Sequence, residues 1–155
     1  MKSLILPAVT AATLGLSFQP ALADEAGEAA MAARHGEMSL MAHALGILGG
    51  MAKGQVEYEK IKAEAAAETL YVVSSIDQHL LWPEGSEAGA LDGSRAKAEI
   101  WTNMDDFTAK WNSLHTATEA MKTAAGESQQ AIGAAMGAVG GACSACHKAY
   151  RTPAS

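Results

Sequence analysis

The chain has few of the residues that fix a structure covalently or by sharp turns. Of its 155 residues only two are cysteines, four are prolines and 5% are aromatic. The two cysteines are close together in the sequence, so a disulfide between them would not cross-link distant segments. Alanine dominates between the few breaks, and no stretch alternates apolar and polar residues with a period of two, which favours helix over strand. We therefore expect an all-α protein.

A hydrophobic run long enough to cross a bilayer is also missing. The apolar N-terminal segment has about 15 residues, fewer than the ~20 of a spanning helix, and Pro7 interrupts it. Its positive start, apolar core and small residues before the first acidic residue predict a secretory signal peptide, residues 1–23, cleaved after Ala23. A retained membrane anchor is the alternative. We expect export to the periplasm and no membrane insertion of the mature protein.

Positive charge is scarce as well. Eleven Lys and Arg against seventeen Asp and Glu give a formal net charge of −6, which becomes −7 when Lys2 leaves with the signal peptide. This balance argues against nucleic acid or an anionic membrane as a partner. The remainder, residues 24–155, has the length of one domain with a single core.

Four stretches carry apolar residues at helical spacing. We expect helices over about 26–53, from Val56 to Trp82, from about Met104 to Gly126, and from near Glu127 towards the C-terminus. Pro83 ends the second helix, and Asn103 caps the third. The second helix is expected to turn its larger apolar residues inward, namely Ile61, Leu70, Val73, Ile76 and Leu80.

Residues 83–103, rich in glycine, serine and charge, have no sustained periodicity and form one long connection. Two short connections and one long one between four amphipathic helices predict an antiparallel four-helix bundle. Such bundles hold cofactors between facing helices.

Both cysteines lie in GGACSACHKAYR, residues 140–151. The order C-x-x-C-H is the attachment signature of c-type haem, in which two thiols add to the haem vinyl groups and the adjacent histidine binds the iron. On a helix Cys143, Cys146 and His147 lie within one turn on a single side, so one flat cofactor can meet all three. In bacteria such attachment takes place in the periplasm. We therefore predict covalently bound haem near the C-terminus.

Three other interpretations of the motif fit it less well. A disulfide within one helix would stabilise little and would leave the following histidine unexplained. A zinc site needs a fourth ligand and usually a second C-x-x-C. A thioredoxin-like thiol oxidoreductase carries its C-x-x-C at a helix N-terminus after a strand, whereas this motif closes the last helix.

Further segments point to a family. With AARHGEM near the mature start, LWPEGS after the second helix, AEIWTNMDDFTAK leading into the third and GGACSACHKAYR at the end, the chain resembles the class II c-type cytochromes, the cytochrome c′ family and its low-spin relatives. The resemblance covers nearly the whole mature chain. It implies a four-helix bundle with one covalently attached haem c, no enzymatic activity, unidentified redox partner proteins and a homodimer formed through the first two helices.

Helical geometry, at about 100° per residue, singles out one face of the first helix. With Met38 set at the centre of the apolar stripe, Arg34, His35, Met41 and Leu45 all lie within about 60° of it. A charged side chain on an apolar stripe needs a partner, and a haem propionate can supply one with bidentate geometry. The resemblance implies this role for Arg34. An arginine that reaches solvent or pairs with a surface glutamate is the alternative.

In the family that the chain resembles, the residue four positions after this arginine faces the open side of the iron. Leu or Phe there leaves a five-coordinate, high-spin iron that binds NO or CO, whereas methionine can close the sixth position. With Met38 at this place, we expect a low-spin electron-transfer cytochrome whose iron ligands are His147 and Met38. A high-spin, gas-binding cytochrome c′ is the alternative. His35, where relatives often carry Gln or Glu, is the next candidate ligand.

The same resemblance places Trp82 at the haem edge and Arg151 beside the proximal histidine. Core packing is the alternative for Trp82, and a frayed, solvated position is the alternative for Arg151. The remaining histidines, His43, His79 and His115, are expected at the surface or as satisfied core residues.

Overall fold

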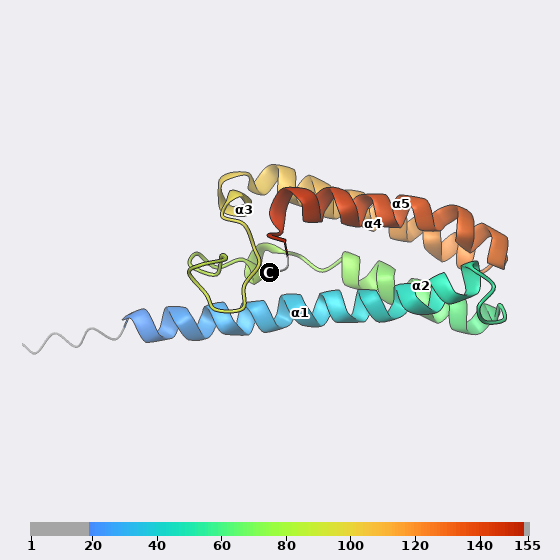
Figure 1. Cartoon of the computed structure of the whole chain (residues 1–155), viewed down its shortest axis with the longest axis horizontal. Coiled ribbons are helices and arrows are strands. Elements are labelled where there is room, and N and C mark those ends of the chain that lie inside the picture. Colours follow the sequence, from blue (N-terminus) through green and yellow to red (C-terminus); the bar gives the residue numbers. More distant parts are fainter. Residues whose placement is uncertain (1–18, 154–155) are drawn as a thin grey trace, which may run out of the picture.

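The computed structural model describes residues 19–153, with side chains from residue 25 onwards. Its elements are α1 (Gln19–Ala52), α2 (Lys60–Ser74), the 3-10 turn η1 (His79–Leu81), α3 (Glu99–Thr102), α4 (Met104–Ala125) and α5 (Gln129–Tyr150). This part of the chain contains no β-strand. In Figure 1, α1 and α2 form one layer and α4 and α5 the other, with successive long helices antiparallel. The predicted all-α, four-helix bundle is confirmed.

The N-terminal helix starts before the predicted cleavage site. Helix α1 begins at Gln19, whereas cleavage is expected after Ala23. Residues 1–18 lie outside the described residues, so the signal peptide stays a prediction. Within residues 19–153, no helix is long and apolar enough to cross a membrane.

The bundle core is built on a regular repeat of α1. Its buried residues follow one another at intervals of three and four, namely Gly27, Ala30, Arg34, Glu37, Met41, Ala44, Leu48 and Met51. This spacing places Met41 near the centre of the buried face, whereas Met38 lies about 60° away on its flank and is half-buried. The prediction that Met38 is the centre of the stripe is therefore wrong.

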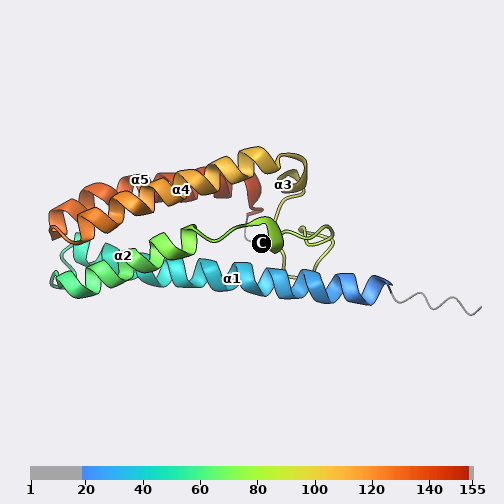
Figure 2. The ribbon, with the colours of Figure 1, turned by 180° about the vertical axis from the view of Figure 1, so that it is seen from behind.

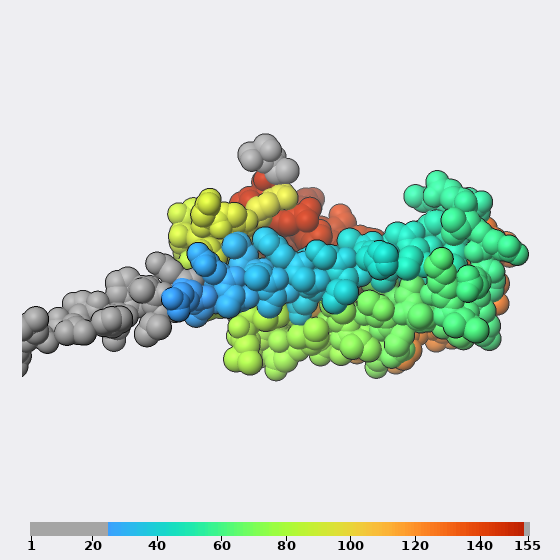
Figure 3. Space-filling view, turned by 90° about the horizontal axis from the view of Figure 1, so that it is seen from below, coloured from blue at the N-terminus to red at the C-terminus, as the bar shows by residue number. Residues whose placement is uncertain are grey.

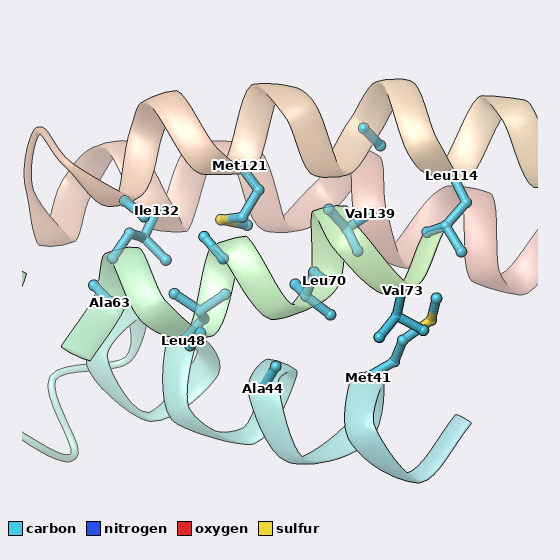
Figure 4. Close-up of a cluster of buried hydrophobic side chains, with 14 of the residues drawn as sticks. Met41, Ala44, Leu48, Ala63, Leu70, Val73, Leu114, Met121, Ile132 and Val139 are labelled. Carbon is cyan, nitrogen blue, oxygen red and sulfur yellow. The ribbon is translucent and has the colours of Figure 1, made fainter. Parts of the chain in front are cut away.

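Apolar side chains of the four long helices meet in this core. Met41, Ala44 and Leu48 of α1 face Leu70 and Val73 of α2 (Figure 4). The opposite layer contributes Leu114, Met121, Ile132 and Val139. Leu48, Met121, Ile132 and Val139 are fully buried. Burial of such side chains stabilises a fold by about 1.5–3 kcal/mol each.

Helix α2 is shorter than its apolar pattern predicts. The hydroxyls of Ser74 and Ser75 donate to the carbonyls of Tyr71 and Val72, and such local bonds compete with helix continuation. The Asp77 carboxylate then accepts the backbone N–H of His79 at 2.9 Å and starts η1. The predicted helix to Trp82 is therefore wrong beyond Ser74.

Three apolar residues predicted to point inward are exposed. Ile61 is 78% exposed, Ile76 41% and Leu80 90%. Ile61 lies in α2 on the face opposite its buried residues, and Ile76 and Leu80 follow the end of α2. Only Leu70 and Val73 of the predicted set are buried. The exposed residues belong to α2 and the segment after it, which lies beside α1 on the face shown in Figure 3.

The long connection is tied to the C-terminus of α5. Lys97 donates its backbone N–H to the Tyr150 carbonyl at 3.0 Å, and Thr152 donates to the Arg95 carbonyl at 2.9 Å. The Arg95 guanidinium also donates to the Thr152 carbonyl. Figure 2 shows this segment, with α3, at the end of the bundle where the chain terminates. The connection thus closes one end of the space between the layers.

Helices α4 and α5 follow the prediction closely. Asn103 precedes α4, although its side chain bonds to Glu99 and Thr102 rather than to the first turn. Ser128, not the preceding glutamate, caps α5 by accepting the Ala131 N–H at 3.2 Å. The apolar pattern of α5, at spacings of three and four, predicts one inward face, and all residues of that face are buried or half-buried, namely Ile132, Ala135, Met136, Val139, Cys143, Cys146, His147 and Tyr150.

Candidate functional site

A cavity lies at the end of the bundle that the long connection closes. Its volume is about 680 Å³, a figure that includes its open mouth. Its wall combines residues of α1, the long connection, α4 and α5, namely Met31, Arg34, His35, Glu37, Met38, Trp82, Ser94, Arg95, Ala96, Ile100, Phe107, Trp111, Cys146, His147, Tyr150 and Arg151. Six of the seven sequence-predicted site residues are among them.

The seventh, Cys143, is one turn earlier on α5. It is half-buried and packs against the bundle core rather than lining the cavity. Cys146 and His147 both line the cavity, and Cys146 packs against a second apolar cluster that contains Phe107 and Tyr150. The two thiols are not bonded to each other. Helix α5 therefore presents Cys146 and His147 to the cavity, with Cys143 one turn away.

Both thiols are protonated at neutral pH. Burial raises the pKa of Cys143. Burial, and to a lesser extent the neighbouring Cys143, raises the pKa of Cys146 to about 11. Redox-active C-x-x-C thiols show the opposite shift, because their thiolates are stabilised. The site is therefore unlike that of a thiol oxidoreductase and keeps its sulfurs as thiols, the form that adds across a vinyl group.

His147 is held as a neutral imidazole. Burial lowers its pKa, and the positive charges of Arg151 and Arg95 lower it further. A neutral ring offers a lone pair to a metal. Arg151 itself is exposed and lines the cavity, and its backbone N–H donates to the His147 carbonyl at 3.0 Å. Arg151 is thus ordered at the end of α5 rather than frayed.

Arg34 is buried, with 6% of its surface exposed. Its guanidinium donates to the Ser86 hydroxyl at 3.1 Å and to the Ser86 carbonyl at 3.3 Å. It also stacks over the Trp82 ring, 4.3 Å from the centroid. No carboxylate of the described residues lies within 4.0 Å of it, and burial lowers its pKa. Arg34 therefore neither reaches solvent nor pairs with a surface glutamate, the two alternatives that the sequence left open.

A buried carboxyl group near Arg34 was not predicted from the sequence. Glu37 is 7% exposed, and burial raises its pKa. Among the described residues its one side-chain partner is Gln78, whose amide nitrogen lies 3.4 Å from one carboxylate oxygen. The Gln78 amide oxygen accepts the Trp82 indole N–H at 3.1 Å. Glu37 follows Arg34 by three residues, a spacing that places both on one face of a helix. The prediction missed this because it centred the buried face on Met38.

Aromatic rings form part of the cavity wall. Trp82 packs edge-to-face on Phe107, with centroids 4.8 Å apart, and Phe107 packs on Tyr150 in the same way at 5.4 Å. The Tyr150 hydroxyl donates to the Asp106 carboxylate. Trp82 is therefore both a core residue and a cavity residue, so the two interpretations of it hold together.

The long connection supplies cavity residues that no motif indicated. Ser94 and Arg95 line the cavity, and the Ser94 hydroxyl donates to the Ser86 carbonyl at 2.7 Å. These residues reach the cavity because the connection is tied to the C-terminus. A segment without periodicity gives no sequence signal for such a position.

On α1, Met38 lines the cavity and Met41 does not. Met41 is buried in the bundle core, against which Met38 also packs. His35 is exposed and lines the cavity. His43 and His79 are exposed, and His115 bonds to Ser74 and stacks on Tyr71, so these three have the ordinary positions expected of them.

One buried donor in the cavity wall lacks a protein acceptor. Among the buried side-chain nitrogen and oxygen atoms of the described residues, only Trp111 Nε1 has no hydrogen-bond partner. Leaving such a group unpaired costs about 1–3 kcal/mol. Together with two protonated thiols, a neutral imidazole and cationic groups between apolar walls, this donor set fits a haem. The ring is apolar, its two propionates are anionic, and its iron needs a nitrogen ligand.

Comparison with known proteins agrees with this fit. A family model described as Cytochrome C' matches residues 29–151. Cytochrome c-554 of Cereibacter sphaeroides is 40% identical over 148 residues, covering 94% of this chain and 96% of that protein. A solved structure of cytochrome c' from Rhodobacter Spheriodes is 38% identical, with a TM-score of 0.78 over 83% of this chain and 98% of that one. A nitric oxide complex of a cytochrome c prime variant from Alcaligenes xylosoxidans is 30% identical, with a TM-score of 0.71 over 82% and 97%.

The match spans almost the whole described chain, includes the C-terminal C-x-x-C-H and agrees with the bundle architecture. Proteins of this family bind one covalently attached haem c, act as electron carriers or gas-binding haem proteins, and are typically periplasmic. On these grounds the chain belongs to the cytochrome c′ family of class II c-type cytochromes.

Proposed function

We propose that this protein carries its haem c on Cys143, Cys146 and His147 and binds a small gas such as NO or CO at the opposite, α1-facing side of the iron. The observation that carries this proposal is the position of Met38. Its side chain lies on the flank of the buried face of α1 and packs against the bundle core. A packed side chain of this kind forms a wall beside an open coordination position. The nitric oxide complex of the Alcaligenes relative supports the same ligand class.

The residues of the chain have distinct tasks in this function. His147, kept neutral by burial and by Arg151, offers its imidazole to the iron from the α5 side. Arg34, fixed by Ser86 and Trp82, provides positive charge for a propionate. On the α1 side, Met31 and Met38 are the apolar residues of the wall, next to Arg34 and Glu37. The haem supplies reversible one-electron chemistry and an open position for a diatomic ligand.

A low-spin electron carrier, which the sequence favoured, becomes the second candidate. The observation in its favour is that Met38 lines the cavity and brings a flexible thioether to it. A methionine ligand stabilises ferrous iron and raises the reduction potential. The geometry supports ligation of the iron by Met38 less strongly than the sequence suggested, because Met38 is not at the centre of the buried face.

Spectra of the purified protein at neutral pH separate the two. A five-coordinate iron gives high-spin ferric and ferrous spectra and binds CO. A methionine-ligated iron gives low-spin spectra, a ferric sulfur-to-iron charge-transfer band and poor CO binding. Met38→Ala changes the spin state only in the second case, and Met41→Ala is the matched control because Met41 packs away from the cavity. A low-spin wild type that becomes high-spin in Met38→Ala would overturn the proposed gas-binding function.

We also propose export to the periplasm after removal of residues 1–23 and assembly as a homodimer through α1 and α2. Exposed apolar side chains on these helices support the dimer, since Leu40 is 53%, Val72 51% and Ile61 78% exposed. Ile61→Glu should shift the mature protein towards monomer in sedimentation velocity. Edman sequencing of the exported protein should start at Asp24. Redox partner proteins would meet the cavity mouth, where Arg95 and Arg151 lie.

A further inference from the structure

Gln78 is a buried residue behind the cavity wall and has no task in the function proposed so far. It directly precedes η1, which packs against α1, and 6% of its surface is exposed. Gln78 does not line the cavity, but its side chain bonds to Glu37 and Trp82, which do. A buried amide between these two neighbours can control where both of them lie.

Both N–H groups of the Gln78 amide have acceptors. The amide nitrogen donates to the Ile76 carbonyl at 3.2 Å and lies 3.4 and 3.5 Å from the two oxygens of the Glu37 carboxylate. The amide oxygen accepts the Trp82 indole N–H at 3.1 Å. Because a primary amide has two N–H donors, one serves the backbone and the other serves Glu37. The bonds to the backbone and to the indole fix the amide, and the amide then fixes the carboxylate.

A cation that could pair with Glu37 lies on the same helix. Arg34 precedes Glu37 by three residues, a spacing at which opposite charges on a helix attract each other. Both side chains are buried, where this attraction is less screened than at the surface. Nevertheless they form no ion pair within 4.0 Å. Glu37 bonds to the neutral amide of Gln78 instead, and Arg34 bonds to Ser86 and stacks on Trp82.

The pKa shifts of the two residues agree with this separation. Burial lowers the pKa of Arg34. Burial raises the pKa of Glu37, and the bond to Gln78 opposes that shift. An ion pair would instead hold the pKa of the arginine up and that of the glutamate down. Within the protein, the guanidinium of Arg34 thus keeps a positive charge that no carboxylate neutralises.

We propose that Gln78 is a positioning residue, which holds the Glu37 carboxylate away from Arg34 and so keeps the Arg34 guanidinium available to a haem propionate. A guanidinium that binds one carboxylate with both arms of its fork has fewer donors for a second. Without Gln78, Glu37 turns to Arg34 and neutralises the charge that stabilises ferrous iron. This inference rests on the pairing of Arg34 with a propionate in the proposed function.

The test measures the reduction potential of the haem-loaded protein after Gln78→Met, which keeps the length of the side chain and removes its amide. The potential should fall, as in Arg34→Gln but by less, because the guanidinium is neutralised and not removed. Gln130→Met, at an exposed position near the start of α5, is the matched control and should equal the wild type. A potential that is unchanged or higher in Gln78→Met would overturn the inference.

A double mutant identifies the route of the effect. In the Glu37→Gln background no carboxylate remains to turn towards Arg34, so adding Gln78→Met should leave the potential unchanged. An equal fall in both backgrounds would mean that Gln78 acts through Trp82 or through packing, which refutes the inference. If Gln78→Met does not fold, Gln78→Asn takes its place, since its amide is one methylene shorter and cannot reach both neighbours.

A crystal structure of the haem-loaded Gln78 variant gives a second readout. The Glu37 carboxylate should lie within hydrogen-bond distance of the Arg34 guanidinium, and a Glu37 that stays apart from Arg34 contradicts the proposed role. The outcomes also separate this inference from the function on which it rests. If Arg34→Gln leaves the potential unchanged, the task of Arg34 at the propionate fails and the inference fails with it. If Arg34→Gln lowers the potential and Gln78→Met does not, the role of Gln78 alone is overturned.

Discussion

Replacing Arg34 by glutamine should lower the reduction potential of the haem. Arg34 is a buried cation with a hydroxyl, a carbonyl and an aromatic ring as neighbours and no carboxylate. Reduction makes the site more negative by one charge, so a nearby positive charge stabilises the ferrous state. Glutamine keeps donors for Ser86 while removing the charge. The change therefore isolates electrostatics from packing as far as one substitution can.

The size of the effect follows from helix geometry. Arg34 lies one turn, about 6 Å along α1, before Met38, so its charge is on the order of 10 Å from a metal that faces Met38. At an effective dielectric constant of about 20, a unit charge at that distance changes the free energy of reduction by about 1.7 kcal/mol, or about 70 mV. Arg34→Lys, which keeps the charge, should restore most of the potential.

Lys53, the residue after the end of α1, provides a matched control. It is exposed at the far end of α1, about 28 Å from Arg34 along the axis and several Debye lengths away at physiological salt. Redox titration at low and physiological ionic strength should show a large decrease for Arg34→Gln and almost none for Lys53→Gln. Equal shifts in the two variants, or no shift in Arg34→Gln at low salt, would refute a charge contribution from Arg34 at the haem edge.

Three further outcomes are expected. Denatured mature protein should keep its pigment through acid-acetone extraction and exceed the polypeptide mass by one haem, with Cys143→Ala and Cys146→Ala each removing one thioether; freely extractable pigment would contradict covalent attachment. Because burial and its bond to Asp106 raise the Tyr150 pKa to about 12, the stability that this tyrosine provides is complete below about pH 10 and is lost as pH rises towards 12. The difference in unfolding free energy between wild type and Tyr150→Phe should therefore shrink over that interval, and a constant difference would count against the bond. Leu48→Ala should lower the free energy of unfolding by about 2–5 kcal/mol, measured by denaturant titration, because Leu48 is fully buried.

Helix content and the haem motif were readable from the sequence because both depend on local spacing. Apolar periodicity located α4 and α5, whose buried faces match their patterns. The same method failed at the end of α2. Ile76 and Leu80 continue the spacing of Val73, but Ser74 and Ser75 bond to their own helix and Asp77 starts a new turn. Side-chain bonds to the backbone overrode a pattern that counts only apolar residues.

The burial of Glu37 and the partners of Glu37 and Arg34 could not be predicted, for a related reason. Glu37 occupies the buried face of α1, but periodicity registers apolar residues and treats a glutamate as a surface position. Its partner Gln78 is 41 residues away, and Arg34 finds Ser86 at a separation of 52. Such pairings depend on how the long connection folds back onto α1. That path is set by its bonds to the C-terminus of α5, which no local pattern encodes.

The arrangement of buried charge explains why one scaffold can serve either of the two functions. Arg34 and Glu37 are one turn apart on the buried face of α1, yet each is held by a neutral partner rather than by the other. Ionised groups in a low-dielectric interior are costly unless compensated. If Arg34 pairs with a haem propionate, as we propose, that anion would compensate one of them, and the polypeptide would gain stability from the cofactor at the place where the cofactor is held. This anchoring is independent of the α1-facing side of the iron. The residue at position 38 is therefore free to determine what happens on that side without altering how the haem is held.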